Sequence, residues 1–120
     1  MTIARTKALD RIWKRTIAPR VGQCFLTRVK EVGPRLEGGS DDPNNDGVAI
    51  NYADGHYQVD YTTNRFRMGF KAGDPVRLCT VSLPKNCPIG DHRGITYRAL
   101  DLRSYRIWEA ADHEHMCGGA

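Results

Sequence analysis

The 120-residue sequence lacks most of the features from which a reaction is commonly inferred. It contains no Gly-x-Ser-x-Gly elbow, no Gly-x-x-x-x-Gly-Lys-Ser/Thr phosphate loop and no His-Glu-x-x-His pair. It also has no run of about 18 apolar residues, so we expect no transmembrane segment. These absences disfavour the common hydrolase, nucleotide-binding and metalloprotease classes, and we expect neither enzymatic activity nor a cofactor.

None of the four cysteines belongs to a Cys-x-x-Cys pair, which disfavours a zinc ribbon or a thioredoxin-like redox site. The even set Cys24, Cys79, Cys87 and Cys117 instead favours two disulfides, although spacing alone does not choose among the three connectivities. Disulfides indicate an oxidising compartment. The first 20 residues, however, show neither an uninterrupted apolar stretch nor a small-residue cleavage site, so a cytoplasmic location with reduced thiols is the alternative.

Positive charge is concentrated at the start of the chain. The formal net charge is +4, yet residues 1–20 hold six Lys and Arg against Asp10 alone. Apolar residues between positions 3 and 18 recur at steps of three and four, which predicts a basic amphipathic helix. Its apolar stripe either caps the domain, or the segment contacts nucleic acid or an anionic membrane surface. The residues that would make such an anionic contact are Arg5, Lys7, Arg11, Lys14 and Arg15.

Residues 21–120 are predicted to form a single small β domain, because short segments rich in β-branched and aromatic residues alternate with turn residues. The strongest pattern is a hairpin over residues 48–61 that turns at Asp54-Gly55. Further strands are expected at residues 24–32, 76–83, 95–102 and 105–108, and a short or edge strand at 66–70. The expected fold is a small antiparallel β-sandwich or partly open barrel with one N-terminal amphipathic helix.

Two segments are weak candidates for metal binding. His113, His115 and Cys117 alternate, so they would share one side of an extended segment, but a disulfide at Cys117 would remove the thiolate ligand. The loop from Asp42 to Asp46 resembles the first half of a calcium loop, although its twelfth position is Ala53 rather than glutamate. We expect no metal at either place.

The run Gly73-Asp-Pro-Val-Arg-Leu-Cys-Thr-Val-Ser-Leu-Pro-Lys-Asn-Cys-Pro-Ile-Gly-Asp-His-Arg-Gly94, with the terminal His115-Met-Cys-Gly-Gly-Ala120, carries a resemblance. It resembles short proteobacterial four-cysteine proteins that share a Gly-Asp-Pro-Val-x-x-Cys-x-Val-x-x-Pro-x-x-Cys-Pro-x-Gly-Asp-x-Arg-Gly pattern and a His-x-Cys-Gly-Gly-Ala ending. The resemblance covers about residues 22 to 120 and implies no activity. It does imply export, and hence a periplasmic or secreted protein with disulfides.

We expect a Cys24–Cys79 bridge between two strands and a Cys87–Cys117 bridge that ties the C-terminal segment to the proline-rich connection. The nearest alternative, Cys79–Cys87, would close a loop of only seven intervening residues. The favoured function is a non-enzymatic binding or accessory module of the bacterial envelope that recognises a protein or a glycan. The alternative is a cytoplasmic or mobile-element protein whose basic helix docks on nucleic acid or an acidic partner protein.

Overall fold

The structure is a computed structural model of the chain, and it describes residues 19–35 and 47–118. The predicted helix of residues 3–18 and the Asp42–Asp46 loop lie outside these ranges. The described residues contain no helix, and hence none that could cross a membrane. They form six strands: β1 (Cys24–Gly33), β2 (Val48–Tyr52), β3 (Tyr57–Asp60), β4 (Pro75–Ser82), β5 (Thr96–Asp101) and β6 (Ile107–Ala111). The prediction of a mainly β domain is confirmed.

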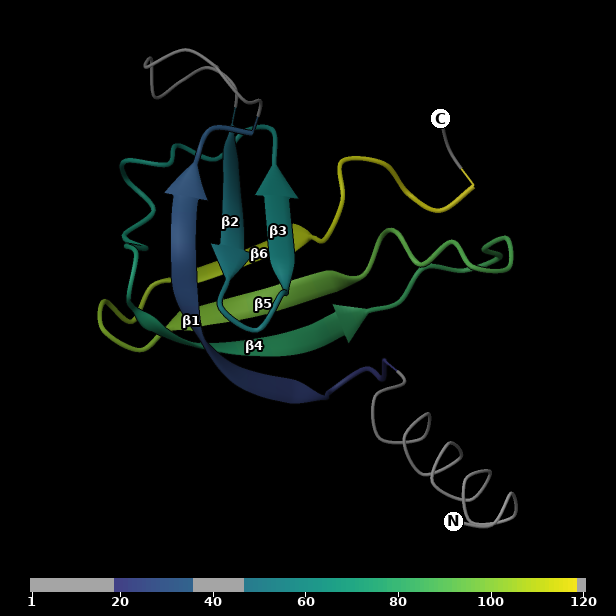
Figure 1. Cartoon of the computed structure of the whole chain (residues 1–120), viewed down its shortest axis with the longest axis horizontal. Helices are drawn as coiled ribbons and strands as arrows, with labels where there is room; N and C mark the ends of the chain where they lie inside the picture. The colour runs from purple at the N-terminus through teal and green to yellow at the C-terminus, as the bar shows by residue number, and fades with distance from the viewer. Residues whose placement is uncertain (1–18, 36–46, 119–120) are drawn as a thin grey trace, which may run out of the picture.

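The strands close into an antiparallel barrel in the order β1-β2-β3-β6-β5-β4. Two three-stranded meanders, β1-β2-β3 and β4-β5-β6, face each other across the interior (Figure 1). Strand β1 joins them, because Cys24–Arg28 pair with β4 and Val29–Gly33 pair with β2, with a register shift between Val29 and Glu31. Of the two expected architectures, the sandwich is wrong, and the barrel is closed rather than partly open.

The barrel interior is filled by alternate residues of each strand. On β4, Val76, Leu78 and Thr80 are buried while Arg77 is exposed. The outer side of β4 faces solvent through Arg77 and holds Cys79 in a disulfide. Interior residues of β1, β2, β4, β5 and β6, together with Phe70 and Ile95, form one hydrophobic core.

The strand expected at residues 66–70 is absent: residues 61–74 form turns. The reason is local hydrogen bonding by polar side chains, which competes with strand pairing. The carboxylate of Asp60 accepts the backbone N–H groups of Thr62 and Thr63, and the side chain of Asn64 accepts that of Phe66. The alternation in this segment instead leaves Phe66 exposed at 63% and places Phe70 in the core.

The contact between β3 and β6 is the weakest part of the barrel, with a single pair in register, Val59 and Ala111. The fully buried side chain of Gln58 reinforces it from inside. Its Nε2 donates to the carbonyl oxygens of Tyr97 at 2.9 Å and Ala110 at 3.1 Å, while its Oε1 accepts the Tyr52 hydroxyl at 2.6 Å. Burial raises the pKa of Tyr52 well above its ordinary value, so the hydroxyl keeps its proton and remains a donor.

Replacing Gln58 with methionine is expected to lower the free energy of unfolding by about 2–3 kcal/mol, because the Tyr52 hydroxyl and two carbonyl oxygens lose their buried partner. Urea unfolding measures the change. The matched variant Tyr52→Phe removes only one of these bonds and should cost about 1 kcal/mol. The double variant should cost less than the sum, since the two residues share a bond. Unchanged stability of Gln58→Met would contradict the role assigned to this amide.

Candidate binding site

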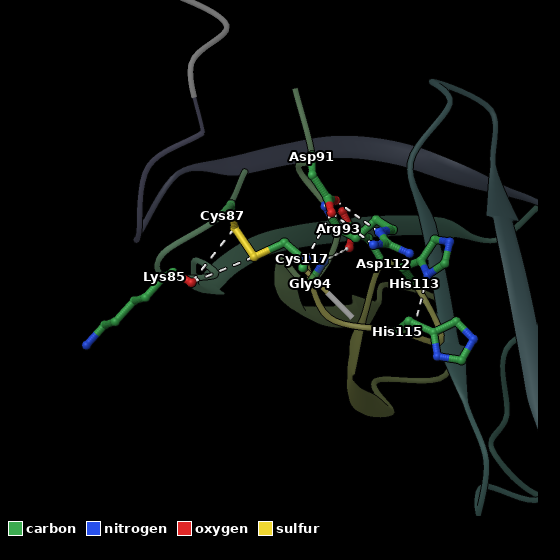
Figure 2. A network of polar contacts seen from close by, with 10 residues as sticks. Lys85, Cys87, Asp91, Arg93, Gly94, Asp112, His113, His115 and Cys117 are labelled. Carbon is green, nitrogen blue, oxygen red and sulfur yellow. Dashed lines mark hydrogen bonds and ion pairs between the residues drawn. A yellow bond between two sulfur atoms is a disulfide. The ribbon is translucent and has the colours of Figure 1, made fainter. Parts of the chain in front are cut away.

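Two segments meet at one end of the barrel and form the candidate site: the β4–β5 connection, residues 83–95, and the segment after β6, residues 112–118. A disulfide between Cys87 and Cys117 joins them, with the two Cα atoms 5.3 Å apart (Figure 2). The second disulfide, Cys24–Cys79, links facing residues of β1 and β4. Both predicted pairings are confirmed, and no described cysteine is free.

Asp91 organises the β4–β5 connection. Its two carboxylate oxygens accept hydrogen bonds from Nε and Nη2 of Arg93, each at 2.9 Å (Figure 2). Oδ2 also accepts a hydrogen bond from the backbone N–H of Gly118 at 2.9 Å. The hydrogen bonds from Arg93, followed by that from Gly118, hold the pKa of Asp91 well below its usual range. The carboxylate therefore stays charged at neutral pH and binds the C-terminal segment to the connection beside the disulfide.

Asp112 fixes the end of the β4–β5 connection that leads into β5. It follows β6 directly, and its Oδ1 accepts the backbone N–H groups of Gly94 at 2.8 Å and Ile95 at 3.0 Å. Gly94 is buried with a φ of +109°, and a Cβ there would lie 2.9 Å from the Met116 side chain. The positive φ therefore favours glycine at this position, whereas the Met116 methyl group belongs to a flexible side chain that can move aside.

The outer surface of the site is a shallow groove with a volume of about 640 Å³, lined by Ile89, Gly90, Asp91, His92, Arg93, Asp112 and His113. Ile89 lies fully exposed at the tip of the connection, and Met116 on the other segment is 56% exposed. Contact with a partner would remove the apolar surface of Ile89 from water, which favours binding at this position. The site therefore combines a rigid base with an apolar tip.

The histidines of the site do not form a metal centre with the residues around them. The predicted donor Cys117 is in a disulfide and has no thiolate to offer. His113 and His115 lie with their ring centroids 5.8 Å apart, and Nδ1 of His113 accepts the backbone N–H of His115. No group of three or more His, Cys, Asp or Glu side chains suited to a metal occurs within residues 19–35 and 47–118.

The acidic side chains near the site form ion pairs and hydrogen bonds with other parts of the protein. Glu114 pairs with Arg35 at 3.3 Å, and the Arg35 guanidinium stacks over Tyr61 at 4.4 Å from the ring centroid. The Tyr61 hydroxyl in turn donates to the carbonyl oxygen of Glu114 at 2.9 Å. These contacts attach the C-terminal segment to the residues that follow β1 and β3. Asp91, Asp112 and Glu114 are each engaged with a different partner.

Comparisons of the chain with protein-family models, with curated proteins and with solved structures find no match. Several residues of the Gly73–Gly94 run and of the C-terminal run nevertheless contact one another in this fold. Cys87, Asp91, Arg93, Gly94 and Cys117 form the rigid base of the site. The sequence prediction singled out these cysteines but missed Asp91, Arg93 and Asp112. The Asp-x-Arg-Gly run of residues 91–94 was an available signal for Asp91 and Arg93, but not for Asp112.

The predicted anionic-partner residues fall outside the part of the chain that the structure describes. These are Arg5, Lys7, Arg11, Lys14 and Arg15. Their role stays a prediction, as does the expected absence of calcium from the Asp42–Asp46 loop.

Proposed function

We propose that this protein is a non-enzymatic, disulfide-stabilised binding module of the bacterial envelope, periplasmic or secreted, that recognises a protein or a glycan. The supporting observation is the Cys87–Cys117 bridge, which holds together a loop pair whose tip, Ile89, is fully exposed. Disulfides persist in oxidising compartments, which favours an extracytoplasmic location. The resemblance to short four-cysteine proteobacterial proteins points the same way.

The shape of the loop site favours a large partner over a small molecule. Small-molecule sites bury most of their ligand in a deep pocket, whereas this groove is shallow and Ile89 projects from it. A rigid loop also loses little conformational entropy on binding, which improves affinity for a surface of matching shape. The non-enzymatic part of the proposal is supported by the structural bonds that occupy Asp91, Asp112 and Glu114.

Alkylation of the unfolded protein followed by mass measurement tests the compartment. Protein purified from its native host without reductant should gain no alkyl group, and four groups after reduction, since all four cysteines are paired. Four alkylated thiols before reduction would overturn the envelope assignment.

Four alkylated thiols before reduction would favour the alternative, a cytoplasmic or mobile-element protein that docks on nucleic acid or an acidic partner protein. The observation behind this alternative is the set of six basic residues within positions 1–20. Binding to DNA should then weaken steeply as salt increases, because neutralised phosphates release counterions. Affinity that does not change with salt would count against it.

A further inference from the structure

Four adjacent strands carry one straight row of outward-facing side chains, in a part of the barrel distinct from the loop site. The pairing register aligns Leu26 of β1, Arg77 of β4, Leu100 of β5 and Ile107 of β6. The neighbouring residues on these strands, such as Leu78, Ala99 and Trp108, are buried, so the row points away from the interior. Leu26 is 78% exposed and Ile107 65% exposed.

The charges on this outer face are mostly positive. A second row beside the first contains the Cys24–Cys79 disulfide and the ion pair of Arg98 with Glu109, whose charges cancel. Arg77 has no ion pair or hydrogen bond within the described residues, and Arg28, two residues beyond Leu26, bonds only the Gly73 carbonyl oxygen. The face therefore offers aliphatic side chains together with uncompensated positive charge.

An exposed aromatic residue lies in the turn two residues before Ile107. Tyr105, in the β5–β6 turn, is 76% exposed and has a φ of +59°, which is unfavourable for a residue with a side chain. Its backbone N–H donates to the carbonyl oxygen of Asp101 at 2.8 Å. Strained, exposed positions of this kind occur preferentially at functional sites.

We infer that this outer face, defined by Leu26, Arg77, Leu100 and Ile107, rests on an anionic lipid membrane. Aliphatic side chains beside arginine suit the boundary between acyl chains and anionic headgroups. A second copy of the chain fits poorly, because two such faces related by a two-fold axis would bring uncompensated positive charges together.

A membrane is also favoured over an acidic protein partner by what precedes the face in the chain. Residues 1–20 carry six basic side chains, and β1 begins four residues later with Cys24. Arg20 and Val21, between the two, are both exposed. A membrane accepts separate basic and apolar surfaces without a matching shape, and stable attachment commonly needs two weak anchors.

Co-sedimentation of the full chain with lipid vesicles tests the inference. Vesicles of 7:3 phosphatidylcholine to phosphatidylglycerol should bind the protein about tenfold more strongly than pure phosphatidylcholine vesicles, since each basic residue near an anionic surface adds attraction. The variants Arg77→Glu and Leu26→Asn with Ile107→Asn should each lower the binding by about tenfold. All three positions face solvent, so the variants should fold normally, which circular dichroism checks.

The matched control is Arg67→Glu, which makes the same charge change at an exposed position of the β3–β4 connection, outside this face. It should reduce vesicle binding by less than about threefold, an effect of net charge alone. Equal binding of the face variants and the unaltered protein would overturn the inference, as would equal binding to neutral and anionic vesicles. A change from dimer to monomer with unchanged vesicle binding would show that the face joins two copies. Binding to an acidic polypeptide but not to vesicles would also overturn it.

These outcomes are independent of the proposed function. The alkylation experiment concerns the compartment, whereas the vesicle experiment concerns one surface of the folded barrel. A protein with two intact disulfides and no affinity for anionic vesicles would refute only the membrane contact.

Discussion

Replacing Cys24 and Cys79 together by serine is expected to lower the free energy of unfolding by about 4 kcal/mol, the chain-entropy value for a bridge with a sequence separation of 55 residues. Most small domains are stable by only about 5–15 kcal/mol, so this loss is a large fraction of the total. The bridge lies on the outer face of the barrel, and serine fits there without burying a hydroxyl group. Thermal and urea unfolding of the double variant measure the effect.

The second bridge provides the control. Replacing Cys87 and Cys117 by serine removes a bridge with a separation of 30 residues, and the same relation gives about 3.5 kcal/mol. This bridge, however, ties only the C-terminal segment to the β4–β5 connection, so local detachment should precede unfolding of the barrel. We expect this variant to change the unfolding midpoint less than the Cys24–Cys79 variant does. We also expect amide exchange in residues 84–94 and 113–118 to be faster than in the unaltered protein. A Cys24–Cys79 variant as stable as the unaltered protein would contradict this ranking.

A buried pair of carboxyl groups, Asp74 and Asp101, is expected to make stability depend on pH in two opposite ways. Asp101 is fully buried and Asp74 is 5% exposed, and the two carboxyl groups hydrogen-bond each other. Oδ1 of Asp101 accepts the backbone N–H groups of Arg103 and Ser104. Its Oδ2 is buried and receives no donor from the described residues.

The two carboxyl groups differ in pKa because their neighbours differ. Burial alone would raise the pKa of Asp74, but hydrogen bonds from Arg103, Asp101 and the Lys71 N–H outweigh it and hold the pKa at about 2. Burial, and then the hydrogen bond to Asp74, raise the pKa of Asp101. Asp74 therefore stabilises the fold above the usual aspartate pKa of about 4, and this contribution is lost as pH falls towards 2. Asp101 stabilises it below about 4, and its contribution is lost as pH rises through its folded pKa.

Two isosteric variants separate these contributions. Asp101→Asn supplies an amide that donates a hydrogen bond to Asp74 but does not titrate. The free energy of unfolding of this variant should therefore no longer decline as pH rises through the folded pKa of Asp101. At pH 7 it should match or exceed that of the unaltered protein. Asp74→Asn leaves Arg103 without its carboxylate partner at 2.7 Å. We expect it to cost about 2–3 kcal/mol at pH 7, less than a fully buried pair, because the Arg103 side chain is 45% exposed.

Urea unfolding at a series of pH values between 2 and 9 measures both effects, since the Asp74 contribution is lost between about 4 and 2. An identical dependence on pH for Asp101→Asn and the unaltered protein would show that Asp101 does not hold the proton shared with Asp74. A neutral effect of Asp74→Asn would show that Arg103 contributes little through this pair.

The parts of the fold that could be predicted from sequence are those set by local pattern. The hairpin of β2 and β3 follows from its alternation and from Asp54-Gly55, where Gly55 has a φ of +95°. Closure of the barrel could not be predicted in this way, since it depends on β1 dividing its length between β2 and β4. The expected strand at residues 66–70 failed because Asp60 and Asn64 hydrogen-bond the backbone around it, which an apolar alternation does not reveal.

The site was only partly predictable for a similar reason. The cysteines stood out by type, and their expected pairing is the observed one. Asp91 and Asp112 are hard to find from sequence because part of their bonding is to distant backbone N–H groups. Asp91 accepts that of Gly118, 27 residues away, in addition to the nearby Arg93 side chain, and Asp112 accepts that of Ile95, 17 residues away. The groove at Ile89 exists only once these contacts have folded the connection, so no property of Ile89 alone predicts it.

The position of Cys117 after the other three cysteines affects how the protein is made. In an oxidising compartment, a chain that enters from its N-terminus presents Cys24, Cys79 and Cys87 while the native partner of Cys87 is still to come. Cys79 and Cys87 are separated by only seven residues and can react early. Correct maturation therefore depends on β1 and β4 pairing before the third thiol is oxidised, or on thiol–disulfide exchange that repairs the wrong bond.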